Sequence, residues 1–72
     1  MAELKFFGYL ADLAGTRAKE VMVERPTRLR EMVPSGFPEG NIVILINEKA
    51  GTLDTVIENE DSVAFMPILS GG

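Results

Sequence analysis

The residue types that usually perform enzyme chemistry are almost missing from this chain. Its 72 residues include no cysteine and no histidine, so it has no thiolate nucleophile and no ordinary general base near neutral pH. The same absence removes the usual ligands of zinc. Without a histidine, Ser35, Ser62 and Ser70 have nothing to activate them as nucleophiles. We therefore expect a chain with no catalytic side chains of its own, no metal site and no bound cofactor.

The two glycines that end the sequence, Gly71 and Gly72, are the exception. A terminal carboxylate is ionised at neutral pH and is a poor electrophile, so a partner would have to activate it, most simply as an acyl-adenylate made from ATP. Glycine has no Cβ and accepts φ of either sign, so it can pass through a channel narrow enough to exclude water. Fully extended, residues 67–72 reach on the order of 20 Å, which would place the carboxylate inside an enzyme while a folded domain stays outside. A frayed or truncated tail is the alternative interpretation.

Composition limits the rest of the molecule to one small domain. Hydrophobic residues make up 46% of the chain, which argues against disorder, and a chain of this length can bury one thin core. The formal net charge of −4 disfavours nucleic acid as a partner, because phosphate contacts need a clustered basic face. The longest apolar run, Ile42 to Ile46, is far shorter than a membrane span, and the first residues lack the pattern of a signal peptide. We expect a cytoplasmic domain with no membrane partner.

Two charged clusters carry weaker possibilities. Glu58, Glu60 and Asp61 could bind a hard cation, but no loop of metal-ligand spacing surrounds them, which favours a solvated acidic turn. The one basic cluster lies between Arg25 and Arg30 and is flanked by glutamates. It is typical of a mixed surface rather than of a phosphate site.

The hydrophobic pattern predicts five strands and one main helix. In chain order these are strands at 4–9 and 19–24, a helix at 27–33, and strands at 41–47, 52–57 and 62–66. The first two strands form a hairpin with an irregular connection, in which residues 10–14 make one helical turn that Gly15 stops. Thr27 would cap the main helix and Pro34 would end it, with an apolar stripe at Leu29, Met32 and Val33. The run at 41–47 reads as a strand buried on both faces, followed by a turn at 48–51.

This order of elements predicts an α+β fold, a β-grasp (ubiquitin-like) mixed sheet with one principal helix over one face. The domain should span residues 1–66 and be followed by a flexible, extended Gly-Gly tail at 67–72. Alternation places six apolar side chains on the helix side, namely Leu4, Phe6, Ile44, Ile46, Val63 and Phe65. Phe7, Leu45 and Met66 then point away, where so small a chain has no second layer to cover them. They are either ordinary exposed apolar residues or a docking patch continuous with the tail.

Three segments carry a resemblance to a known family. Residues 6–15 match its opening Phe-Phe, short turn and Leu-x-Gly close, Ile46-Asn47 matches an apolar-Asn step, and residues 60–72 match its acidic turn, Val-Ala-Phe strand and Gly-Gly end. On these segments the chain resembles the ubiquitin-like sulfur carriers, and among them the small subunits of molybdopterin synthase. Three features depart from the family pattern: a short helix region, Ala11 where many members have arginine, and Met66 in place of a second aromatic residue.

The resemblance implies a non-catalytic carrier subunit of a sulfurtransferase complex. An adenylating enzyme related to ubiquitin-activating enzymes would use ATP to activate the Gly72 carboxylate. A sulfur donor protein would then convert it to a thiocarboxylate, for delivery to the molybdopterin synthase large subunit in molybdenum or tungsten cofactor biosynthesis. The positions expected to contact partners are Gly71, Ser70, Ile68, Met66, Phe7 and Leu45.

Two other functions fit the same ending. The chain could carry sulfur for thiamine synthesis or tRNA thiolation, or it could be a protein modifier that Gly72 joins to lysine through an isopeptide bond. The Phe-Phe opening and the approach through residues 63–67 favour the molybdopterin pathway.

Overall fold

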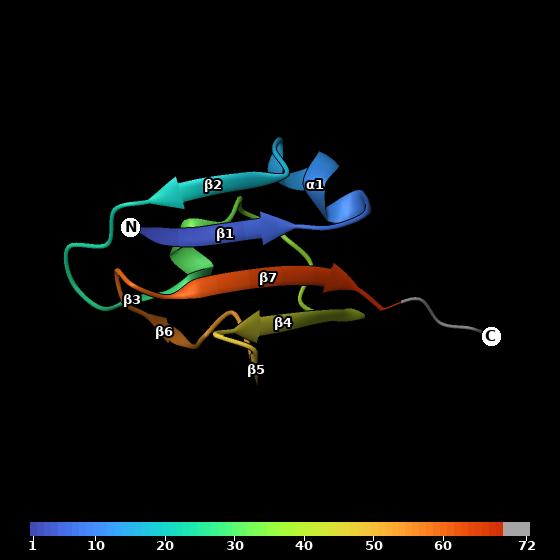
Figure 1. Cartoon of the computed structure of the whole chain (residues 1–72). Helices are drawn as coiled ribbons and strands as arrows, with labels where there is room; N and C mark the ends of the chain where they lie inside the picture. Colours follow the sequence, from blue (N-terminus) through green and yellow to red (C-terminus); the bar gives the residue numbers. More distant parts are fainter. Residues whose placement is uncertain (69–72) are drawn as a thin grey trace.

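Alternating apolar side chains build a five-stranded mixed sheet. The computed structural model describes residues 1–68 and places the strands in the order β2-β1-β7-β4-β5 (Figure 1). Their bounds are β1 Ala2–Phe6, β2 Ala18–Val21, β4 Ile42–Ile46, β5 Lys49–Gly51 and β7 Ser62–Pro67. The first and last strands, β1 and β7, are parallel neighbours at the centre, and the other pairs are antiparallel. This is the predicted β-grasp arrangement.

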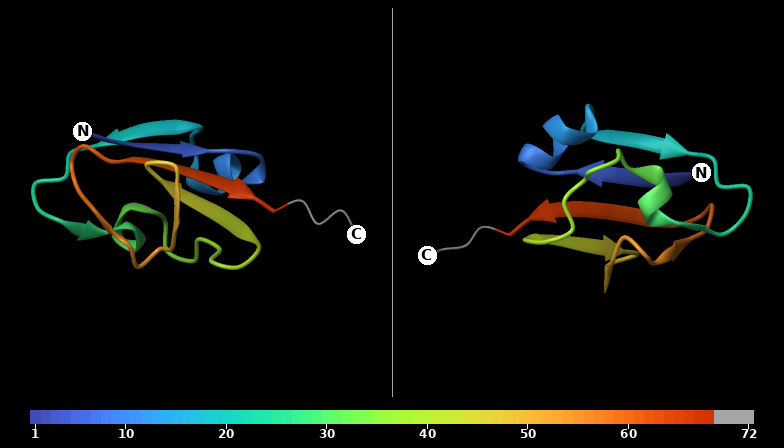
Figure 2. Two further views of the ribbon diagram at one scale, coloured as in Figure 1. Left: turned by 60° about the horizontal axis from the view of Figure 1, so that its bottom comes forward. Right: turned by 180° about the vertical axis from the view of Figure 1, so that it is seen from behind.

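The remaining elements are short. The α-helix α1, Tyr9–Ala14, lies in the connection between β1 and β2, and it ends at Gly15, whose φ of 81° no bulky residue readily adopts. A second sheet pairs β3, Thr27–Arg28, with β6, Val56–Ile57. Between β3 and β4 a 3-10 helix, η1, spans Leu29–Met32. Seen from behind, η1 and the loop after it lie across one face of the main sheet (Figure 2).

The core lies between the main sheet and this layer. The side chains of β1 and β7 alternate strictly, so that Leu4, Phe6, Val63 and Phe65 are buried on the covered side. Phe6 stacks on Phe65 with ring centroids 4.7 Å apart, and Phe37 from the loop packs edge-on against both rings. All six residues expected on this side contribute to the core, with Ile46 half-buried at its margin.

The expected main helix at 27–33 is wrong. Thr27 belongs to a strand, its hydroxyl donates to the Arg25 carbonyl instead of capping a helix, and only a 3-10 turn follows. The reason is that the amides of Leu29 and Arg30 donate to carbonyls in the chain between β5 and β6, at 3.0 and 2.7 Å. The apolar stripe was predicted correctly, since Leu29 and Met32 are buried. Within residues 1–68 the α-helix is α1, where the sequence predicted one helical turn.

Three further predictions need correction. The turn expected at 48–51 is shorter, because only Asn47 and Glu48 link β4 to β5, and Lys49–Gly51 forms the edge strand. The expected strand at 52–57 is reduced to β6, which pairs with β3 and not with the main sheet. The run at 41–47 is not buried on both faces: of its residues only Ile44 is buried, because one face of the sheet is uncovered in the described part of the chain.

Candidate functional site

The site begins where β7 leaves the sheet. Pro67 is the last residue of β7 and lies opposite Ile42, and the next amide, that of Ile68, donates to the Asn41 carbonyl at 3.0 Å. We call Pro67 and Ile68 the tail root. The Ile68 side chain is 51% exposed. Three expected site residues, Ser70, Gly71 and Gly72, lie outside the described residues, so their chemistry is taken up below as a proposal.

The three apolar residues expected to face away from the core lie on the uncovered face. Phe7 is 48% exposed, and Leu45 and Met66 are half-buried. Because Phe6 pairs with Phe65, Phe7 comes level with Met66 at the ends of the parallel strands β1 and β7. Leu45, paired with Ala64, lies one row farther from the tail root.

Sequence reasoning missed two members of this surface. Val43 pairs with Met66, and Ala64 lies between Lys5 and Leu45 on the same face. The alternation that selected Leu45 also selects Val43, two residues earlier in the same strand, so the signal was present. We call the whole set the open-face patch: Phe7, Val43, Leu45, Ala64 and Met66.

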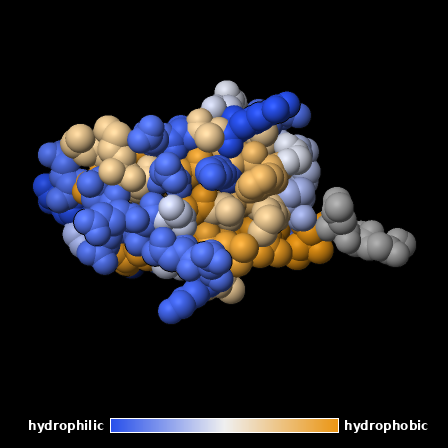
Figure 3. Space-filling model, in the orientation of Figure 1, coloured by the Kyte–Doolittle hydropathy of each residue, from blue (hydrophilic) through white to orange (hydrophobic). Residues whose placement is uncertain are grey.

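Polarity changes along the open face. Apolar residues gather over the ends of β7 and β4 nearest the tail root, and hydrophilic residues dominate the opposite end (Figure 3). The register explains this division, because Glu20, Glu3 and Ser62 pair side by side across β2, β1 and β7 at that far end. The part of the open face that adjoins the tail root is therefore the apolar part.

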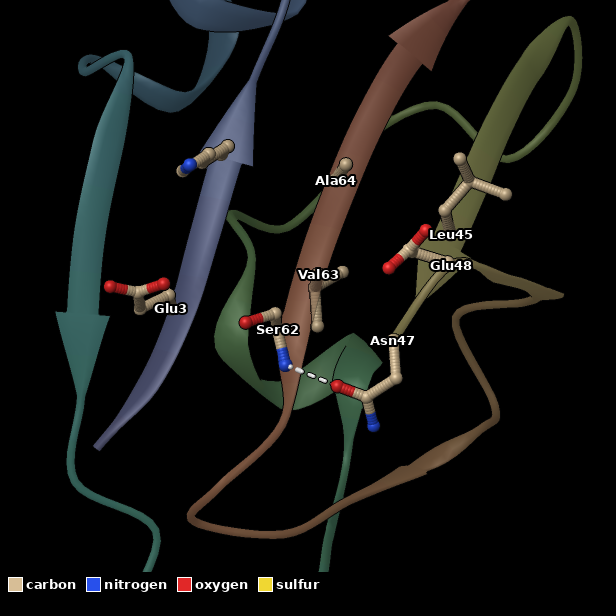
Figure 4. Close-up of a pocket in the computed structure, with 8 residues that line it drawn as sticks. Glu3, Leu45, Asn47, Glu48, Ser62, Val63 and Ala64 are labelled. Atoms are coloured by element: carbon tan, nitrogen blue, oxygen red, sulfur yellow. Dashed lines mark hydrogen bonds between the residues drawn. The ribbon is translucent and has the colours of Figure 1, made fainter.

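A shallow hollow of about 340 Å³ lies between the two ends, with Leu45 and Ala64 at one side and Glu3 and Glu48 at its rim (Figure 4). Asn47 at its border is held in place from both sides of its amide. Its side-chain nitrogen donates to Asp61 Oδ1 at 2.8 Å, and its side-chain oxygen accepts from the Ser62 amide at 2.9 Å. These two bonds connect Asn47 to the start of β7 and to the acidic turn before it.

Asn47 and Glu48 form a two-residue turn in which both residues have positive φ, at 52° and 70°. This is the pattern of a type I′ hairpin, which matches the twist of the flanking strands. Asparagine tolerates the left-handed conformation, whereas glutamate adopts it at a cost. The apolar-Asn step of the sequence thus has a structural role, which is to close the hairpin next to the open face.

The acidic residues give no metal centre in the described part of the chain. No group of three such side chains in residues 1–68 is placed to hold an ion. Asp61 instead accepts the Glu58 amide on Oδ2 at 2.7 Å and the Asn47 side chain on Oδ1. Residues 1–68 also contain no helix long and apolar enough to cross a membrane.

Arg30, from the basic cluster, joins the layer that covers the core. Its guanidinium pairs with Glu39 at 2.9 Å and with Asp54 at 3.1 Å, which connects η1 to the following loop and to the segment before β6. The hydrogen bonds from Arg30 lower the pKa of the Glu39 carboxyl below its ordinary value. This cluster therefore includes a structural ion-pair network, which sequence reasoning did not predict.

Comparisons with known proteins agree with this geometry. The ThiS family model matches residues 4–72. The chain is 28% identical to the molybdopterin synthase sulfur carrier subunit of Escherichia coli K12, over the full length of both chains. The crystal structure of SAMP1 from Haloferax volcanii superimposes with a TM-score of 0.73 at 24% identity, covering 99% of this chain and 98% of that one. A provisionally assigned molybdopterin converting factor, subunit 1, from Pyrococcus furiosus gives 0.68 at 19% identity, covering 94% and 97%. The two structures confirm the β-grasp fold.

Proposed function

The chain belongs to the ThiS family, and we propose that it is a sulfur carrier whose Gly72 carboxylate is activated by a partner and converted to a thiocarboxylate. The observation that carries the proposal is the Gly-Gly ending that follows a β-grasp domain, inside a family match that runs through Gly72. The proposal includes that Gly72 is the last residue of the protein in the cell.

Adenylation and sulfur transfer require little from this chain beyond a free carboxylate at the end of an accessible segment. The carboxylate oxygen attacks the α-phosphate of ATP in the activating enzyme, pyrophosphate leaves, and an acyl-adenylate forms. A hydrosulfide equivalent from a sulfur donor protein then attacks the acyl carbon and displaces AMP, which leaves a thiocarboxylate at Gly72. Both steps need a site that excludes water, and residues without a Cβ allow that site to close around the backbone. ATP is bound by the activating partner.

We further propose that the sulfur goes to molybdopterin, with this chain as the small subunit of the synthase and a catalytic large subunit as its partner. The support is the 28% identity to the Escherichia coli molybdopterin synthase sulfur carrier subunit over the whole of both chains. Sulfur transfer for thiamine or tRNA, and conjugation of Gly72 to lysine, remain as the alternatives that experiment separates.

The open-face patch is the proposed docking surface for the activating enzyme and the large subunit. Its support is position and exposure: Phe7 and Met66 lie level with each other beside the tail root, Phe7 is 48% exposed, and Met66 is half-buried. Ile68, Ser70 and Gly71 continue the contact along the backbone that enters the partner. Burial of such side chains is worth about 25 cal/mol per Å² of apolar area removed from water.

Intact-mass spectrometry of the protein isolated from cells tests the proposal. We expect a chain that ends at Gly72, with a fraction heavier by one oxygen-to-sulfur exchange localised to that residue. Conjugates to lysines of other proteins would favour the modifier instead. Reconstitution then separates the pathways, because the thiocarboxylated chain mixed with the large subunit should convert a pterin precursor to molybdopterin. A chain that carries neither sulfur nor conjugates in cells would overturn the proposal.

A further inference from the structure

The tail root leaves the sheet beside a backbone that has no room for a side chain. Gly8, directly after Phe7, has φ of 59° and ψ of −143°, a conformation that residues with a Cβ rarely adopt. A Cβ built on Gly8 would lie 2.9 Å from Cγ of Pro67 and 3.5 Å from its Cδ. The backbone of Gly8 therefore packs directly on the proline ring, and the Phe7 amide, which donates to the Phe65 carbonyl at 2.9 Å, holds the two strands at this spacing.

A second backbone contact limits the tail root from the opposite side. Asn41, the residue before β4, has φ of 60°, and its carbonyl accepts the Ile68 amide at 3.0 Å. Asparagine is the residue besides glycine that takes this left-handed conformation most readily. Because β7 lies between β1 and β4, Pro67 and Ile68 are contacted from the β1 side by Gly8 and from the β4 side by Asn41.

We propose that Gly8 and Asn41 form a collar that fixes the direction in which the chain leaves the sheet, and that Gly8 is a positioning residue for the chemistry at Gly72. This inference rests on the proposed function. The role depends on the absence of a side chain at position 8, because a Cβ there would prevent the direct contact between Gly8 and Pro67.

A small change in the direction in which the chain leaves the sheet would displace the Gly72 carboxylate by a larger distance. From Ile68 to Gly72 the backbone advances about 14 Å when it is extended, as entry into a partner requires. A change of about 10° in the exit direction would then move the reacting carboxylate by about 2 Å, and a misplacement of 1 Å can already lower a rate about 100-fold. The open-face patch does not include residues 68–72. A change in docking should therefore alter the half-saturating concentration, and a change in positioning should alter the rate at saturation.

The experiment compares Gly8→Ala with Gly15→Ala. Both glycines bound α1 and both have positive φ, but a Cβ on Gly15 would meet no atom within 4 Å. Both substitutions introduce backbone strain, which is larger at Gly8 because its ψ of −143° lies outside the left-handed region that Gly15 occupies, and only Gly8→Ala displaces Pro67. ATP–pyrophosphate exchange catalysed by the activating enzyme is measured against carrier concentration, which gives the rate at saturation and the concentration for half-saturation.

We expect Gly8→Ala to lower the exchange rate at saturation on the order of 100-fold while the half-saturating concentration stays within about 3-fold of the parent, because the misplacement acts on the reacting end. Gly15→Ala should change neither by more than about 3-fold. A Gly8→Ala chain that exchanges like Gly15→Ala would overturn the inference. So would a loss confined to the half-saturating concentration.

Pro67→Ala keeps the test valid if Gly8→Ala does not fold. It removes the ring from the collar without adding strain at position 8, so the rate at saturation should also fall. Pro67→Ala removes the ring atoms that a Cβ at position 8 would contact, so in that background Gly8→Ala should lower the rate much less than it does in the parent. Additive losses would contradict direct contact between Gly8 and Pro67.

A readout that needs no enzyme separates the collar from the proposed function. The Ile68 amide is protected by the Asn41 carbonyl, so its hydrogen exchange, followed by NMR, should accelerate about 10-fold or more in Gly8→Ala and not in Gly15→Ala. Unchanged protection in Gly8→Ala would overturn the collar whatever the enzyme does. A parent chain that supports no exchange at all would overturn the proposed function, and the amide measurement would then decide the collar by itself.

Discussion

The two faces of the main sheet are built from the same strands and have different physical roles. On the covered face Phe65 is fully buried and packs against two other phenylalanine rings. On the open face its neighbour Met66 is half-buried and pairs with Val43, with no covering layer in residues 1–68. Successive residues of one strand therefore divide between stability and surface contact.

This division explains how so small a domain can offer apolar surface without losing its core. In a strand, side chains alternate between faces, so each strand supplies one set of residues for packing and another for the uncovered surface. The covered face is held by the layer of η1 and its loop, which Arg30 connects through Glu39 and Asp54. The open face has no such layer among residues 1–68, and we propose it as the docking surface for partners.

The largest expected effect lies on the covered face. Phe65→Ala should lower the free energy of unfolding by about 3–5 kcal/mol, because it removes a fully buried ring and leaves a cavity between Phe6 and Phe37. Denaturant unfolding measures the change. A cost below about 1 kcal/mol would show that this face is not the stability core and would remove the contrast between the two faces.

The adjacent residue on the open face should behave in the opposite way. Met66→Lys should change the free energy of unfolding by less than about 1 kcal/mol. It should weaken binding to the activating enzyme or the large subunit by about 1–3 kcal/mol, which is about 5- to 150-fold. Met22→Lys is the matched control, since Met22 is 64% exposed and lies outside the open-face patch. Equal affinity for the two lysine variants, measured by calorimetry, would reduce the patch to ordinary surface.

The hairpin beside the open face contains strain that can be relieved. Glu48 has φ of 70° in a type I′ turn whose preferred second residue is glycine. Glu48→Gly should therefore raise the free energy of unfolding by about 1 kcal/mol, as the cost of the left-handed conformation is removed. Asn47→Gly serves as the comparison, because asparagine already tolerates this conformation and its side chain holds Asp61 and Ser62. Destabilisation by Glu48→Gly would mean that the glutamate side chain contributes more than its backbone costs.

The smallest expected effect concerns the ion pairs of the covering layer. Hydrogen bonds from Arg30 lower the pKa of Glu39 from its ordinary value of 4.5, so the folded state binds the proton less readily than the unfolded chain does. The stabilisation is therefore present above pH 4.5 and is lost as the pH falls through the lower, folded-state value. Glu39→Gln should melt slightly below the parent at neutral pH, and the two should converge in acid and at high salt, because the pair is exposed to solvent. A difference that persists at low pH would assign the effect to packing.

Much of the fold could be predicted because burial of one face imposes a period of two. Leu4, Phe6, Val63 and Phe65 follow that period, and their inward faces were predicted correctly. The first strand, predicted to reach Tyr9, ends at Phe6, because Tyr9 begins α1. The sequence predicted a helix at 27–33 that the fold does not contain, because the amides of Leu29 and Arg30 donate to a segment more than twenty residues later in the chain. Strands as short as β3 and β6 contain too few residues to establish a period.

The candidate site also has one part that the sequence could predict and one part that it could not. Phe7, Leu45 and Met66 could be placed on the open face from alternation alone, which also applies to Val43. Contacts between distant segments could not be found in this way, and the packing of Gly8 against Pro67 is one example. The sequence shows a glycine after two phenylalanines, but the reason for it lies at the other end of the chain.

The central claim is that the reacting group is the carboxylate of Gly72, presented by a domain that itself performs no chemistry. Removal of Gly72 tests it most directly, with ATP–pyrophosphate exchange by the activating enzyme and thermal melting measured on the same preparations. The deletion shortens the chain by about 3.5 Å and moves the carboxylate out of reach, so exchange should be abolished. The free energy of unfolding should stay within about 0.5 kcal/mol of the parent, since no core residue changes. Exchange at the parental rate without Gly72 would contradict the account.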